Sequence, residues 1–212
     1  MKKTMGKLVP LIWMMSIPIS NIFYRLLNNS SRGAYSLILD IDKKVPFIKE
    51  FILPYIIWYP FIFLALIYLR FKDKGIYYRT LISLNIGLIS CYLIFYFFQT
   101  TVARPTLVGT DIFTDLVNII YNHDRPYNCF PSVHVITTYI VMRGINIVSK
   151  KKLILLSSNI IGALIILSTQ FVKQHVILDL IAAILLGELI FKTSIEGYYQ
   201  VSLFTMKNKL EN

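Results

Sequence analysis

The sequence predicts an all-α, polytopic membrane protein with about six transmembrane helices, and three observations lead to this fold class. Hydrophobic residues make up 56% of the 212-residue chain, and its mean hydropathy is +0.61. A soluble domain of this size does not need so much apolar surface. Six stretches are long enough, at roughly 17–23 residues, to cross a bilayer. Basic residues also gather in alternate loops, which is typical of helical membrane proteins. We therefore expect a single membrane domain over residues 1–212.

The predicted spans follow one another along most of the chain, and the first is the least regular. It contains Pro10 and Pro18 and follows a basic segment, so it has the outline of a signal peptide. It lacks a good small-x-small cleavage site, which favours a helix that is retained over one that is cleaved. The six spans lie near residues 8–25, 51–69, 80–98, 132–149, 153–171 and 175–191.

The long segment between spans three and four contains one candidate for a short additional helix. GTDIFTDLVNIIY, residues 109–121, places four apolar side chains at helical spacing: Ile112, Leu116, Ile119 and Ile120. A short helix lying in the membrane interface would explain this pattern. A plain loop with scattered apolar residues would explain it equally well.

The net charge of +11 indicates membrane topology rather than binding to nucleic acid. Basic residues do not form one patch but cluster in alternate short segments, which marks those segments as cytoplasmic. The long loop 26–50 is mixed in charge. We expect both termini to be cytoplasmic and no nucleic-acid partner. The basic clusters are Lys2, Lys3 and Lys7; Arg70, Lys72, Lys74 and Arg79; Lys150, Lys151 and Lys152; and Lys192, Lys207 and Lys209.

Three charged residues inside predicted spans stand out, because a charge there is costly and therefore informative. Arg143 in span four and Glu188 in span six lie at similar depths, which predicts an interhelical ion pair that fixes the two spans side by side. Alternatively, either side chain could extend toward the cytoplasmic surface, so that its charged group lies in water. Asp179 follows His175 by four residues, so we expect both on one face of the same helix. The carboxylate would then accept the Nδ1–H of the imidazole, either for structure or for catalysis.

Several polar residues converge at the outer surface in this topology. His134 begins span four and His175 begins span six, while Arg104 follows span three. Ser132 is placed to cap span four, and Lys173 lies in the tight turn before His175. Histidines, cations, a hydroxyl and a helix N-terminus fit an oxyanion, specifically a phosphate. Cys91 and Cys129 lie at different depths, so we expect neither a disulfide nor a metal site.

With these residues in view, the sequence resembles the type 2 phosphatidic acid phosphatase superfamily, which also includes vanadium haloperoxidases. The resemblance covers roughly residues 50–192. The first motif is reduced to Arg104-Pro105, and Phe97 stands where the family has a lysine. The second reads Pro131-Ser132-Val133-His134, with valine in place of glycine. The third reads Ser168-Thr169, five residues, His175, three residues and Asp179, with threonine in place of arginine. This pattern looks most like the branch of inositol phosphorylceramide synthase-like and sphingomyelin synthase-like proteins.

The resemblance implies a role for each matching residue and no metal or cofactor. His175 would be the nucleophile that forms a phosphohistidine, and Asp179 would orient it. His134 would protonate the departing lipid alkoxide and then act as base. The remaining residues would hold the phosphate oxygens, with Lys173 and Arg125 compensating for the missing cations: Arg104, Ser132, the Val133 N–H, Lys173 and Arg125.

Three functions remain open from the sequence. The first is an integral membrane phosphatase acting at the outer leaflet of the cell membrane on a lipid such as phosphatidic acid, phosphatidylglycerol phosphate or a polyprenyl pyrophosphate. The second is a lipid phosphotransferase that uses the same residues but passes the phosphorylated head group to an alcohol. The third is a transporter or a non-enzymatic scaffold, which we disfavour because the polar groups concentrate at one surface. Partners are the lipid substrate and the bilayer, and the sequence does not fix an oligomeric state.

Overall fold

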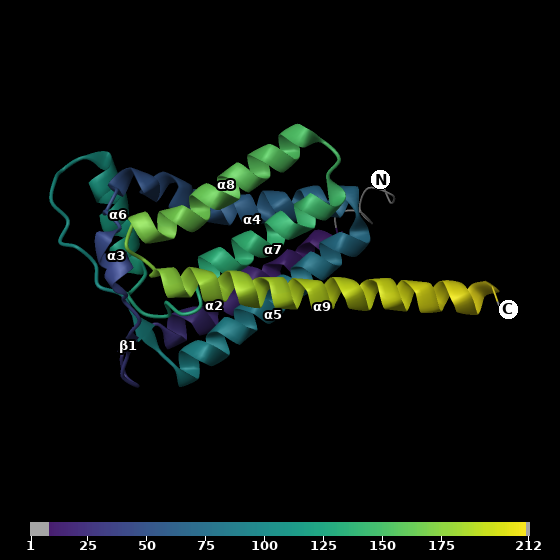
Figure 1. Ribbon diagram of the computed structural model, residues 1–212, viewed down its shortest axis with the longest axis horizontal. Coiled ribbons are helices and arrows are strands. Elements are labelled where there is room, and N and C mark those ends of the chain that lie inside the picture. The colour runs from purple at the N-terminus through teal and green to yellow at the C-terminus, as the bar shows by residue number, and fades with distance from the viewer. Residues whose placement is uncertain (1–8, 211–212) are drawn as a thin grey trace.

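The computed structural model describes the backbone of residues 9–210 and side chains as far as residue 194. Its long helices lie alongside one another in a bundle, and α3, α6 and β1 gather at one end (Figure 1). The helices of the bundle are α2 (Ser16–Leu27), α4 (Ile52–Lys72), α5 (Lys74–Phe97), α7 (Val133–Val148), α8 (Lys152–Phe171) and α9 (Ile177–Leu210). The other described elements are η1 (Val9–Met15), β1 (Tyr35–Ser36), α3 (Asp40–Lys44), η2 (Lys49–Phe51), β2 (Thr100–Thr101) and α6 (Ile112–His123).

The predicted all-α fold class is confirmed, with one small addition. Strands β1 and β2 form a parallel pair of two residues each, in which Tyr35 lies opposite Thr100. The predicted helix in residues 109–121 is also present as α6, so the alternative of a plain loop is wrong. Asp111 caps α6, because its Oδ1 accepts the backbone N–H groups of Phe113 and Thr114 at 3.1 and 3.3 Å.

Three helical stretches in the described part of the chain are long and apolar enough to cross a membrane, namely Lys49–Lys72, α5 and α8. Helix α7 is apolar but shorter. The first predicted span contains a 3-10 segment, η1, followed by α2, and residue 8 lies outside the described residues. Large apolar side chains are exposed along α8, among them Leu153, Leu156 and Ile160. An exposed apolar surface of this kind is expected where a helix contacts lipid. The count of six spans stays a prediction.

Helix α7 lies at the centre of the bundle and packs against α4, α5, α8 and α9. Gly144 permits a close approach of α7 to α5 and α4. A Cβ atom there would meet Thr80 Oγ1 at 2.6 Å and Leu69 Cδ1 at 2.9 Å, both closer than real Cβ contacts. The first turns of α7 are buried throughout residues 133–138. The start of this helix is therefore held in place from several sides.

Buried amides attach the loop before α7 to the end of α2. Gln99 donates from Nε2 to the Leu27 carbonyl at 2.7 Å and to Asn128 Oδ1 at 2.8 Å. Asn128, which has a φ of 58°, returns its backbone N–H to Gln99 Oε1 at 2.8 Å. Asp124 accepts hydrogen bonds from the Tyr24 hydroxyl at 2.9 Å and from Asn28 Nδ2. These contacts fix the segment that leads into Cys129 and α7.

Asp42 connects the loop before α4 to the start of α9. It is 7% exposed, and its Oδ1 accepts the backbone N–H of Ile177, the first residue of α9, at 2.8 Å. Its Oδ2 accepts the N–H of Leu39 at 2.8 Å. One carboxylate thus satisfies donors at the beginning of two helices that are far apart in the sequence.

We expect Asp42→Ala to lower the free energy of unfolding by about 1–2 kcal/mol, because two partly buried N–H groups at the starts of helices lose their acceptor. Asp40→Ala is the matched control, since the Asp40 side chain is 92% exposed and pairs only with Lys43 among the described residues. Thermal unfolding of the detergent-solubilised protein measures both. Equal melting temperatures for the two variants would show that Asp42 does not stabilise α9.

Candidate active site

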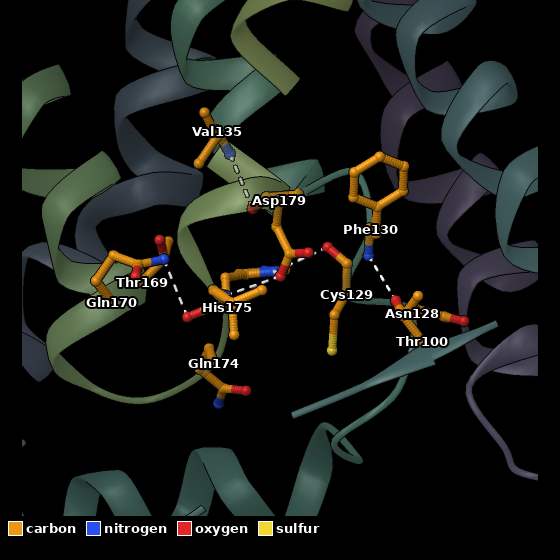
Figure 2. A network of polar contacts seen from close by, with 12 residues as sticks. Thr100, Asn128, Cys129, Phe130, Val135, Thr169, Gln170, Gln174, His175 and Asp179 are labelled. Atoms are coloured by element: carbon orange, nitrogen blue, oxygen red, sulfur yellow. Dashed lines mark hydrogen bonds and ion pairs between the residues drawn. The ribbon is translucent and has the colours of Figure 1, made fainter. Parts of the chain in front are cut away.

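His175 lies at the end of the bundle where α7 and α9 begin, in the turn between α8 and α9. Its Nδ1 is 3.2 Å from Asp179 Oδ2 and 3.0 Å from the carbonyl oxygen of Cys129. Figure 2 shows the imidazole pointing toward both acceptors. Two acceptors at Nδ1 favour the tautomer in which Nδ1 carries the proton and Nε2 has a free lone pair. This arrangement leaves Nε2 available as a nucleophile.

The prediction that His175 and Asp179 share a helix is wrong, because α9 begins only at Ile177. Asp179 itself explains the late start. Its Oδ2 accepts the Val176 N–H at 2.9 Å, while its own N–H donates to the Val176 carbonyl at 3.0 Å. This reciprocal pair caps the helix at Val176 and leaves His175 just outside. The side chains still meet, although not through an intact helical turn.

The turn that presents His175 is shaped by the end of α8. Lys173 has a φ of 53° and reverses the chain. The N–H groups of Gln174 and His175 then donate to the Thr169 carbonyl at 3.0 and 3.1 Å. Gln170 donates from Nε2 to the His175 carbonyl at 3.0 Å. Thr169, where the resembled family has an arginine, is fully buried and contributes a backbone acceptor here.

His134 lies in the first turn of α7, with its ring centroid 5.8 Å from that of His175. Two aromatic rings flank it, Trp58 at 4.2 Å and Tyr55 at 4.6 Å between centroids. Trp58 is itself fixed, because its Nε1–H donates to Thr137 Oγ1 at 2.9 Å. His134 Nδ1 has no hydrogen-bond partner among the described residues. Packing against two tilted aromatic rings therefore holds the side chain of His134, whereas hydrogen bonds hold that of His175.

Ser132 and Val133 form the junction between the loop and α7. Ser132 is fully buried, and its Oγ accepts the Val135 N–H at 3.3 Å, as expected of an N-cap. Its backbone N–H donates to the Asp179 carbonyl at 3.3 Å. Val133 is buried against the apolar core. This junction ties the start of α7 directly to the start of α9.

Two of the predicted phosphate-binding cations lie beside His175. Arg104 donates to the Tyr121 carbonyl at 3.1 Å and to Gln174 Oε1 at 2.5 Å, and its guanidinium lies 4.3 Å from the centre of the Tyr121 ring. Lys173 Nζ donates to the carbonyls of Asp42 and Val45 at 3.2 and 2.5 Å. Burial lowers the pKa of Lys173. Both cations are thus held in fixed orientations by protein acceptors.

A cavity of about 320 Å³ opens beside these residues. Arg104, Lys173 and His175 all line it, together with apolar side chains that include Ile38, Val102 and Val176. A few convergent polar groups within an apolar lining are typical of small-molecule binding sites of this size. The cavity can therefore bring a phosphate group to the imidazole of His175.

The other predicted site residues are not among those that line this cavity, and they include His134, Ser132, Val133 and Asp179. Arg125 is exposed and is not among the cavity-lining residues. Phe97, at the position of the family lysine, is 80% exposed at the end of α5. Arg143 Nε lies 3.0 Å from Glu188 Oε2 and links α7 to α9 deeper in the bundle, where the Tyr139 hydroxyl also donates to Glu188 at 2.9 Å.

Sequence reasoning missed the aromatic pair around His134 and the amide of Gln174. Tyr55 and Trp58 are three residues apart, so they share one face of α4. That spacing was visible in the sequence, but it does not reveal which neighbouring helix the face contacts. Gln174 directly precedes His175, and its contact with Arg104 joins residues 70 positions apart.

The comparisons with known proteins point to one family. A family model described as the PAP2 superfamily matches residues 48–193, which is well over half of the chain. Neither the curated proteins nor the solved structures give a significant match. His134, His175, Asp179 and Arg104 all fall within the matched region. The chain therefore belongs to the PAP2 superfamily, whose members carry out phosphatase and phosphotransferase chemistry on phosphate esters.

Proposed function

We propose that this protein is an integral membrane lipid phosphatase that works through a phosphohistidine at His175. The observation that carries the proposal is the orientation of this imidazole. Its Nδ1 is engaged by Asp179 and by the Cys129 carbonyl, and the ring borders a cavity that Arg104 also lines. A buried histidine fixed in this way has one nitrogen free to attack phosphorus.

The reaction proceeds in two steps at one phosphoryl group. In the first, His175 Nε2 forms a bond to phosphorus while the bond from phosphorus to the lipid oxygen breaks, and His134 gives a proton to the departing alkoxide. In the second, His134 takes a proton from water, the water oxygen bonds to phosphorus, and the phosphorus–nitrogen bond breaks. The distance of 5.8 Å between the two ring centroids allows both imidazoles to serve one phosphoryl group.

The phosphate oxygens carry the negative charge that the protein must balance. Arg104 and Lys173 supply positive charge at the cavity, and the Ser132 hydroxyl and the Val133 N–H lie at the start of α7, where the helix dipole also favours an anion. Arg125 is too exposed to join them without a rearrangement of its loop. Asp179 stabilises the positive charge that develops on His175.

Apolar surface around the bundle and within the cavity supports a lipid substrate. The site lies at one end of the long helices, which is the level of the lipid head groups if those helices cross a bilayer. The distribution of basic loops supports an extracytoplasmic position for this end, with both termini in the cytoplasm. The residues assigned to catalysis require no metal or cofactor.

A lipid phosphotransferase of the inositol phosphorylceramide synthase-like or sphingomyelin synthase-like type is the second candidate. Its support is the reduced positive charge of the site, because Phe97 and Thr169 replace two cations of the resembled family. Fewer cations suit a phosphodiester with one charge better than a phosphomonoester with two. A transporter or scaffold lacks comparable support, since the paired histidines and the cavity lie at one end of the bundle.

Phosphate release by the purified protein in detergent tests the proposal. Phosphatidic acid, phosphatidylglycerol phosphate and a polyprenyl pyrophosphate would be compared, each in the presence of EDTA. We expect release from at least one lipid and no loss with EDTA. Release that EDTA abolishes would contradict a metal-independent reaction. Head-group transfer to an added alcohol without phosphate release would instead establish the phosphotransferase.

A further inference from the structure

Three metal-ligating side chains meet at the predicted nucleophile. Cys129, His175 and Asp179 each offer one ligand atom, and these atoms all lie within 4.8 Å of one another. Their exposed fractions are 3%, 6% and 0%. The three side chains come from the loop before α7, the turn before α9 and the first turn of α9, and Figure 2 shows them close together. We propose that they form a zinc site and that zinc bound there inhibits the enzyme.

The carboxylate of Asp179 is only half satisfied without a cation. Its Oδ2 accepts from Val176 and His175, at 2.9 and 3.2 Å. Its Oδ1 is buried and has no hydrogen-bond partner among the described residues. A buried polar atom without a partner is costly, so such an atom calls for an explanation. A cation bound at Oδ1 would satisfy it.

The thiol of Cys129 is the second ligand with spare capacity. Its hydrogen-bonding contact is a weak one to the Pro126 carbonyl at 3.7 Å. Burial and the nearby carboxylates of Asp179 and Asp124 raise the pKa of this thiol. A divalent cation reverses this effect, because it offsets the repulsion between a thiolate and a carboxylate. On binding, the thiol proton passes to solvent as the sulfur–metal bond forms.

The combination of donors favours zinc over magnesium or calcium. One sulfur, one imidazole nitrogen and one carboxylate oxygen are all common zinc ligands, whereas magnesium and calcium prefer oxygen alone. Three protein ligands leave a fourth position for water, as in open zinc sites. The ion can enter through the cavity, because His175 is one of its lining residues.

Zinc would inhibit the enzyme whether it binds Nε2 or Nδ1 of His175. This inhibitory role rests on the proposed function. Zinc on Nε2 would occupy the lone pair that attacks phosphorus. Zinc on Nδ1 would displace the hydrogen bond to Asp179 and draw electron density from the ring. In both cases the imidazole becomes a poorer nucleophile.

Cobalt(II) provides a test of the site that does not depend on activity, because a cobalt–thiolate bond absorbs in the near ultraviolet. The full chain in detergent would be titrated with cobalt(II) and then with zinc(II). We expect the absorption in wild type, its loss on zinc addition, and its absence in Cys129→Ser and Cys129→Ala. Cys91→Ser is the matched control, since Cys91 is also a buried free cysteine but lies within α5. This control should keep the absorption.

Zinc inhibition of phosphate release would be measured on the same variants. We expect the zinc concentration for half-inhibition to rise at least about tenfold in Cys129→Ser and to stay unchanged in Cys91→Ser. Absorption that is missing in wild type, or that persists in both Cys129 variants, would overturn the site. Cobalt binding without any effect of zinc on phosphate release would overturn the inhibitory role. Cobalt binding in a protein that releases phosphate from no lipid would uphold the site and contradict the proposed phosphatase.

Discussion

Replacing His175 with alanine is expected to lower the rate of phosphate release by about 10³-fold or more, since the reaction loses its nucleophile. The rate at saturating lipid phosphate measures the effect. His123→Ala is the matched control. His123 is exposed in the last turn of α6, where its Nδ1 lies 2.8 Å from the Ile119 carbonyl. It should retain near wild-type activity. A His175→Ala protein that is folded and active within tenfold of wild type would contradict the role of this residue.

The folded state of His175→Ala must be checked because the imidazole also contacts the Cys129 carbonyl. His175→Gln serves as a second variant, since its amide can donate to the same acceptors but is not a nucleophile. Thermal unfolding in detergent would compare both with wild type. Loss of activity in a variant that melts like wild type assigns the effect to chemistry rather than to packing.

Replacing His134 with alanine is expected to have an effect that depends on the leaving group. With an alkyl phosphate, the first step should slow by about 10²–10⁴-fold, because the departing alkoxide needs a proton. With a nitrophenyl phosphate, the leaving group is stable as an anion and the first step should change little. Release of nitrophenol in the first turnover measures this step separately from hydrolysis of the phosphohistidine.

Trp58 offers a control on this interpretation because its ring packs against that of His134 but cannot act as the general acid. Trp58→Leu should also slow the reaction with the alkyl phosphate more than that with the nitrophenyl phosphate. The loss should be smaller than in His134→Ala, since the imidazole is kept and loses only one flanking ring. Trp58→Phe should keep most of the activity because an aromatic ring remains. Equal loss on both substrates in His134→Ala would contradict the assignment of His134 as the general acid.

The sequence was sufficient to predict the helical fold and three of the polar residues that line the cavity, Arg104, Lys173 and His175. The apolar stretches coincide with α4, α5 and α8 because long apolar helices are determined by local composition. The spacing of His175 and Asp179 predicted their contact, although not the cap at Val176, after which α9 begins. The position of α6 was also readable, since Asp111 precedes an apolar run at helical spacing.

Contacts between distant segments could not be predicted in the same way. The Cys129 carbonyl reaches His175 across 46 residues, and Asp42 caps α9 across 135 residues. Such contacts depend on how helices rotate and cross, which hydrophobic periodicity does not specify. The contact between the rings of Trp58 and His134 depends likewise on the rotation of α4 against α7. These residues determine how the imidazoles are oriented.

The most direct test of the account is to trap a covalent intermediate. The protein would react briefly with a lipid phosphate whose transferred phosphoryl group is radiolabelled and be quenched under alkaline conditions, in which phosphohistidine survives. Peptide mass spectrometry would then locate the label. The account predicts a phosphoryl group on His175, none in His175→Ala, and no change in His123→Ala. Label on another residue, or continued turnover by His175→Ala with no labelled intermediate, would contradict a phosphohistidine mechanism at this site.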